Sequence, residues 1–89
     1  MLNKSVPITN RRGLHARSAS VLAKTSSEFK SEICISSSRA TANGKNIMSL
    51  LLLQASFQSN INIQISGEDE VQAMETIVAL IKNKFGEEE

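Results

Sequence analysis

The clearest structural signal in this chain is the segment Asn60-Ile61-Asn62-Ile63-Gln64-Ile65-Ser66. Its isoleucines alternate strictly with polar side chains, which is the period of a strand with one buried and one solvated face. We therefore expect the isoleucines to face a core and the polar side chains to face water. A strand of this kind is typical of an antiparallel sheet that is covered on one side only.

Three further strands are predicted from shorter patterns in the preceding part of the chain. The first contains Pro7, which suits an edge strand because the N–H that proline lacks breaks no hydrogen-bond ladder there. In the second, Ile33 and Ile35 alternate with polar residues, and Asn43-Gly44 provides a strong turn signal after the third. These strands are expected near residues 6–8, 32–36 and 40–42.

Apolar residues at helical spacing predict three helices. The first follows residue 15 and ends near Ser27, and the second begins after Asn46, a good N-cap. The third is expected from about Glu70 to Phe85, with Asp69 as its cap and Gly86 at its stop. Its predicted buried side comprises Val71, Met74, Ile77, Val78 and Ile81.

The order of elements is therefore β-α-β-β-α-β-α. Together with one polar sheet face, this order predicts an α+β open-faced sandwich, in which a four-stranded antiparallel sheet carries three helices on one face. A chain of 89 residues has room for one modest core, so we expect residues 1–89 to form a single domain.

Composition excludes several classes of function. Ten basic and nine acidic residues give a net charge of +1, which is too balanced for a general nucleic-acid binder. No apolar run approaches the roughly 20 residues of a membrane span, and the N-terminus lacks the hydrophobic stretch of a signal peptide, so a cytoplasmic protein is expected. Cys34 has no disulfide partner, and one cysteine with one histidine makes no zinc site, so no metal is predicted.

The only histidine lies in the segment Arg12-Gly13-Leu14-His15-Ala16-Arg17-Ser18-Ala19, where a loop gives way to the first predicted helix. A neutral imidazole is a competent nucleophile near pH 7. The unpartnered N–H groups of a helix start can receive phosphate oxygens, and Arg17 can add a charge-assisted contact. The alternative is structural, since a lone histidine is often a surface or helix-end residue and a nearby arginine is often simply solvated.

This segment closely resembles the active-site motif of the histidine-containing phosphocarrier protein (HPr) family of the bacterial phosphoenolpyruvate-dependent phosphotransferase system. The family pattern Gly-Leu-His-Ala-Arg is intact at residues 13–17, and the similarity runs from the first strand to Lys84-Phe85-Gly86. Two positions differ from many members. Ser18 replaces a common proline, and Asn46 replaces a regulatory serine, so modification by a serine kinase is not expected.

The resemblance implies an α+β sandwich and a phosphocarrier with a transient phosphohistidine, which is not a stand-alone enzyme. His15 would accept a phosphoryl group on its δ1 nitrogen from enzyme I, and an A component of the sugar-specific or nitrogen-related branch would take it away. The catalytic candidates are His15 and Arg17, and no cofactor is implied. The candidate phosphate-binding residues are Ala16, Arg17 and Ser18. The Ser18-Ala19 pair and the Lys84-Phe85-Gly86 ending favour the nitrogen-related branch without excluding sugar uptake.

The second predicted helix has more apolar residues than a short helix can bury, which favours a partner-docking face. The candidates for this face are Leu14, Ile47, Met48 and Leu51, with Arg17 and Lys45 at its border. The alternative places about half of the apolar residues of this helix in the core. A carrier that uses one face for successive partners would most simply be a monomer.

Two other classes of function remain open from the sequence. One is a regulatory binding module of the same fold that docks to a transcription factor or kinase, although the intact His15 and Arg17 argue against a purely non-catalytic version. The other is an unrelated small α+β interaction domain in which the histidine is incidental.

Overall fold

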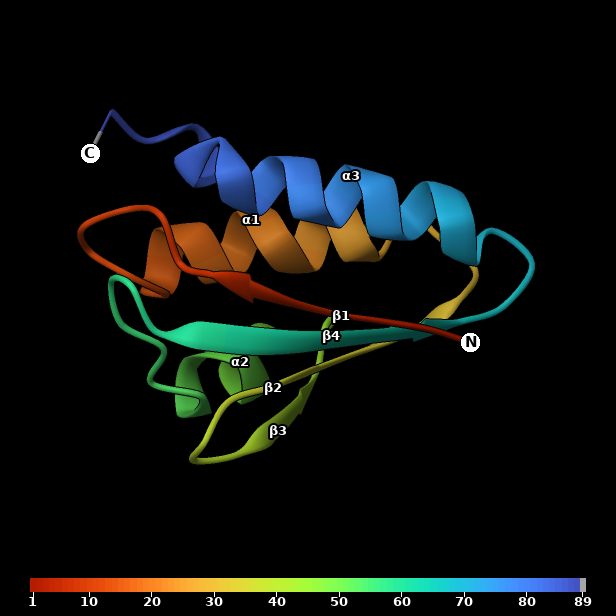
Figure 1. The fold of residues 1–89 in the computed structure, drawn as a ribbon, viewed down its shortest axis with the longest axis horizontal. Coiled ribbons are helices and arrows are strands. Elements are labelled where there is room, and N and C mark those ends of the chain that lie inside the picture. The colour runs from red at the N-terminus through yellow and green to blue at the C-terminus, as the bar shows by residue number, and fades with distance from the viewer. Residues whose placement is uncertain (89) are drawn as a thin grey trace.

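The computed structural model describes residues 1–88 and contains one four-stranded sheet, three α-helices and a short 3₁₀ turn (Figure 1). The elements in chain order are β1 (Leu2–Pro7), α1 (Ala16–Ser26), β2 (Glu32–Ser36), β3 (Thr41–Asn43), α2 (Ile47–Leu52), β4 (Asn60–Ser66), α3 (Glu70–Lys82) and η1 (Lys84–Gly86). This order confirms the predicted open-faced sandwich. Within the described residues, no helix is long and apolar enough to cross a membrane.

The sheet has the order β1-β4-β2-β3, and all neighbouring strands are antiparallel. Strand β4 lies between β1 and β2, so its isoleucines are flanked on both sides, with Val6 opposite Ile61 and Ile35 opposite Ile63. The isoleucines of β4 are at most 1% exposed. Strand β1 is at an edge, as Pro7 predicted.

Helices α1 and α3 lie side by side over the sheet, and α2 packs beside α1 (Figure 1). Leu22 of α1, Leu50 of α2 and Ile77 of α3 are fully buried in one hydrophobic cluster with the isoleucines of the sheet. This packing fixes where each helix begins relative to the sheet. In particular, α1 and α3 run in opposite directions, so the N-terminus of α1 lies near the C-terminal end of α3.

Four details of the predicted helices and strands were wrong. The first strand covers Leu2–Pro7, so it begins earlier than predicted and ends before Ile8. The third helix ends at Lys82 rather than Phe85, because Lys84 and Phe85 adopt positive φ angles of 58° and 55° that break the helical ladder. Val71 is 61% exposed, and Ala73 occupies the core instead. The third strand covers residues 41–43, one residue later than expected.

Asp69 also differs from its predicted role. It precedes α3 but makes no side-chain cap bond. Its carboxylate instead accepts hydrogen bonds from the backbone N–H groups of Lys30 and Ser31, at 2.9 and 3.0 Å, and from the Ser31 hydroxyl. The side chain therefore ties the start of α3 to the loop before β2.

Candidate functional site

His15 is the N-cap residue of α1, with an extended backbone conformation. The loop before it makes a sharp turn at Gly13, whose φ of +68° is in the left-handed region that side chains disfavour. The N–H of Leu14 then donates to the Ala55 carbonyl at 2.8 Å, and the Leu14 side chain is only 7% exposed. The backbone that carries His15 is thus anchored to the segment before β4.

The buried Ser18 side chain stabilises the same helix start through hydrogen bonds. Its hydroxyl accepts the His15 N–H at 2.9 Å and lies within hydrogen-bond distance of the Gly13 and His15 carbonyls, at 3.1 and 3.2 Å. Ser18 was predicted to bind phosphate, but its hydroxyl is fully buried and committed to this network. The Ser18 hydroxyl is therefore not available to a phosphate.

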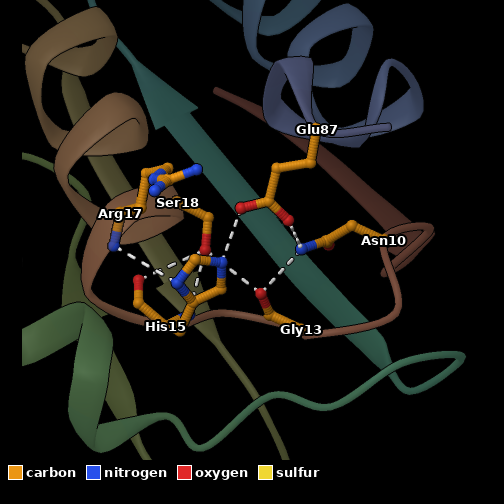
Figure 2. A network of polar contacts seen from close by, with 6 residues as sticks. All are labelled: Asn10, Gly13, His15, Arg17, Ser18 and Glu87. Carbon is orange, nitrogen blue, oxygen red and sulfur yellow. Dashed lines mark hydrogen bonds and ion pairs between the residues drawn. The ribbon is translucent and has the colours of Figure 1, made fainter. Parts of the chain in front are cut away.

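The His15 ring has a different partner on each nitrogen (Figure 2). Nε2 lies 2.5 Å from Oε2 of Glu87, and Nδ1 accepts the backbone N–H of Arg17 at 3.3 Å. A carboxylate accepts hydrogen bonds, whereas an amide N–H donates them. Both contacts are satisfied together when Nε2 carries the proton and Nδ1 carries the lone pair.

Glu87 is itself held in place by Asn10, as Figure 2 shows. The fully buried Asn10 donates from Nδ2 to Oε1 of Glu87 at 2.7 Å and to the Gly13 carbonyl at 2.8 Å. Partial burial alone would raise the pKa of Glu87. Hydrogen bonds from Asn10 and His15 and the positive charge of Arg12 outweigh this effect, so the pKa of Glu87 is lowered. The carboxylate is therefore ionised at neutral pH.

The positively charged side chains lie beside this network. Arg12 and Arg17 line a shallow hollow whose other walls are residues 85–88. Ala16 and Arg17 are exposed at the first turn of α1, which contains no acidic residue. The structure therefore brings the predicted residues His15, Ala16 and Arg17 together at a helix start that can accept an anion. Residues 1–88 contain no cluster of three or more histidine, cysteine or acidic side chains that could hold a metal.

Only some of the predicted docking residues are exposed on one surface. Ile47 and Met48 are 41% and 71% exposed, whereas Leu51 is half-buried against the core. Leu14 is buried in the core and leaves this face, which corrects the prediction. Lys45 donates from Nζ to the Phe29 carbonyl at 2.7 Å, so its ammonium group is fixed to the loop after α1.

Sequence reasoning missed three residues of the site and its surroundings. Leu52 is 68% exposed and lies one turn after Met48, so the i,i+4 spacing of the two could have identified it. We call the exposed surface of Ile47, Met48 and Leu52 the apolar α2 face. Asn10 and Glu87 were also missed, because no local pattern marks two residues that are 77 positions apart.

The family model described as "PTS HPr component phosphorylation site" matches residues 2–83. Phosphocarrier protein HPr of Neisseria meningitidis serogroup B is 40% identical over 89 residues, which are 100% of both chains. Phosphocarrier protein NPr of Shewanella violacea is 37% identical over 86 residues, covering 97% of this chain and 94% of the relative. The crystal structure of HPr-C-His from Thermoanaerobacter tengcongensis superposes with a TM-score of 0.94 at 36% identity, covering 100% of both chains. This chain therefore belongs to the HPr family of phosphocarriers of the phosphotransferase system.

Proposed function

We propose that Nδ1 of His15 accepts a phosphoryl group from enzyme I charged by phosphoenolpyruvate, and that an A component then takes this group away. The observation that carries the proposal is the placement of the His15 ring at the start of α1. Its Nε2 is engaged by Glu87, while its Nδ1 faces the backbone N–H of Arg17. The nitrogen that carries the lone pair thus lies at the positive end of a helix.

The transfer is a displacement at phosphorus. The Nδ1 lone pair attacks the phosphoryl group on the donor, the Nδ1–P bond forms, and the donor N–P bond breaks. The Arg17 N–H is only weakly bound to Nδ1, at 3.3 Å. When that lone pair enters the new bond, this N–H becomes available to a phosphate oxygen, together with the N–H of Ala16.

The charged side chains add moderate stabilisation. The Arg17 guanidinium borders the hollow beside His15 with Arg12, and contacts of this kind contribute about 1 to 3 kcal/mol each. A carrier must hold phosphate long enough to travel and still release it to the next protein. An exposed helix start with one or two arginines suits that requirement better than a deep pocket.

The first test is labelling with enzyme I and radioactive phosphoenolpyruvate. We expect one acid-labile, alkali-stable label on the wild-type protein and none on His15→Ala. Arg17→Ala should retain its melting temperature but accept phosphate about tenfold more slowly, because it loses one charge-assisted contact. Arg39→Ala, which removes another exposed arginine, is the matched control. Persistent labelling of His15→Ala would refute the assignment of the acceptor.

We place partner docking on the apolar α2 face, because α2 packs beside α1 and this face is exposed. Met48→Glu should change the free energy of unfolding by less than about 0.5 kcal/mol, since Met48 is a surface residue. It should weaken binding to enzyme I by about 2 kcal/mol, or roughly thirtyfold, because it places a charge in a desolvated contact.

The control for docking is Val71→Glu, which places the same charge on an exposed apolar residue at the start of α3. Figure 1 places this helix start at the other end of the molecule from the start of α1. Titration calorimetry and thermal melting measure the two effects. Equal affinities of the Met48 and Val71 variants would remove the apolar α2 face from the docking surface.

For the acceptor, we propose an A component of the nitrogen-related branch, in line with the Ser18-Ala19 pair and the Lys84-Phe85-Gly86 ending. The protein would act as a cytoplasmic monomer that presents one face to each partner in turn. Phosphorylated protein should transfer its label faster to a nitrogen-type than to a sugar-specific A component. Faster transfer to the sugar-specific protein would reverse the assignment. Docking to a transcription factor or kinase without any labelling of His15 would favour the regulatory binding module.

A further inference from the structure

We propose that Glu87 is a positioning residue for phosphoryl transfer. Its carboxylate holds the proton on Nε2 of His15, aims the Nδ1 lone pair at the incoming phosphoryl group and balances the charge that the ring gains. This inference rests on the proposed function, in which His15 is the acceptor. It adds a residue from the far end of the chain to the chemistry of the site.

The contact between the two side chains is close and partly shielded from water. Nε2 and Oε2 are 2.5 Å apart, and the His15 and Glu87 side chains are 18% and 13% exposed. An ionised carboxylate at this distance requires a proton between the two atoms. That proton is on Nε2, so the Nδ1 atom of the neutral ring is left as the acceptor of the Arg17 N–H.

The position of Glu87 is specified by the fold. Phe85 is buried in the core, and the positive φ angles of Lys84 and Phe85 redirect the chain after α3 toward α1. Non-glycine residues rarely adopt this conformation, so neighbouring contacts must stabilise it. Asn10 then holds the second oxygen of the Glu87 carboxylate at 2.7 Å. The carboxylate is thus fixed relative to the loop that carries His15.

The Glu87 carboxylate can balance the positive charge that the His15 ring gains during phosphoryl transfer. When the Nδ1–P bond forms and the donor N–P bond breaks, the ring keeps its Nε2–H and becomes an imidazolium bearing a phosphoryl group. The adjacent carboxylate stabilises that positive charge, as an aspartate does for the histidine of a serine protease. When the next acceptor attacks phosphorus, the Nδ1–P bond breaks and the ring returns to its neutral form. No proton leaves the ring in either step.

The test combines a spectroscopic signature with single-turnover kinetics. In protein labelled with ¹⁵N at histidine, we expect a slowly exchanging Nε2–H resonance that is lost in Glu87→Ala. The maximal rate of transfer from phosphorylated enzyme I should fall roughly tenfold in Glu87→Ala, the factor for a hydrogen bond to a charged group, without a change in the half-saturating concentration of enzyme I. Glu87→Gln should lose a similar part of the rate because it removes the charge. Glu75→Gln on the exposed side of α3 is the control, and it should change neither measurement.

Four outcomes would overturn the proposal. They are an unchanged Nε2–H resonance in Glu87→Ala, loss of that resonance with an unchanged rate, a higher half-saturating concentration with an unchanged maximal rate, and wild-type kinetics of Glu87→Gln. The third outcome would assign Glu87 to docking instead. A wild-type protein that takes no label would refute the proposed function separately, because the Nε2–H resonance is measured before any phosphate is added.

Discussion

α1 and α3 both begin with backbone N–H groups that have no partner within the helix, but the side chains around these two helix starts differ in charge. At α1, the first turn has no acidic residue, and the capping atom is an imidazole nitrogen that accepts one weak hydrogen bond. At α3, the helix begins with Glu70, and the Asp69 carboxylate lies directly before it. Both helix starts carry the positive end of a dipole. Only the start of α1 leaves that charge open to a phosphate, so the flanking side chains decide which helix forms a site.

The acidic side chains at α3 are used for structure. Glu70 accepts the Gly67 N–H at 3.2 Å and pairs with the amino group of Met1. The hydrogen bond from the Ser31 hydroxyl, followed by that from the Lys30 backbone, lowers the pKa of Asp69 below its ordinary value. The start of α3 is therefore a connection between segments, whereas the start of α1 is the proposed site of phosphorylation. Two pairs of variants and one pH series test this difference.

The largest effect is expected at the glycines before the two helices. A Cβ at Gly13 would lie 2.5 Å from the Ala55 carbonyl oxygen, and a Cβ at Gly67 would lie 2.7 Å from Cα of Ser31. Both residues also have positive φ angles, so Gly13→Ala and Gly67→Ala should each lower the free energy of unfolding by more than about 2 kcal/mol. Urea denaturation measures these losses. At a temperature where both variants are folded, only Gly13→Ala should slow phosphoryl transfer, and an equal slowing by both would contradict the comparison.

A smaller effect is expected at the buried serines. Ser18→Ala removes the acceptor of the His15 N–H and the hydroxyl beside Gly13, so it should cost about 1 to 3 kcal/mol. It should also slow labelling by enzyme I, because it loosens the backbone that carries His15. Ser31→Ala removes one donor to Asp69 and should reduce stability less, with no effect on labelling. Slower labelling of Ser31→Ala would show that the two helix starts are coupled.

The smallest effect concerns pH and is confined to α3. Because the pKa of Asp69 is lowered in the folded protein, its contribution to stability is complete above the ordinary value of 3.8 and is lost as the pH falls through the folded pKa. Asp69→Asn should therefore have a lower melting temperature than the wild-type protein at pH 7, and this difference in melting temperature should disappear in acid. Melting curves of both proteins from pH 7 to pH 2.5 measure this difference. A gap that stays constant over this range would mean that the Asp69 carboxylate is not stabilised by its contacts.

Local patterns predicted most of the fold because they depend on residues close in sequence. The alternation in β4, the edge position of Pro7 and the Asn46 cap of α2, whose side chain accepts the Ser49 N–H at 3.0 Å, need only a few neighbouring residues. Where a local pattern competed with packing, prediction failed. Phe85 continues the helical period of α3, yet burial of its ring is achieved through a left-handed turn.

The sequence by itself determined the elements, their order and the placement of His15 at a helix start, because each follows from periodicity or from contacts within three residues. Only the tertiary structure decided what surrounds the ring. Glu87 reaches the His15 ring from a position 72 residues later, and the buried Asn10 holds the Glu87 carboxylate. The tertiary structure also decided that Ser18 is buried and that Leu14 lies in the core, outside the proposed docking face. Contacts between distant segments depend on how helices and sheet pack together, and no local pattern records that arrangement.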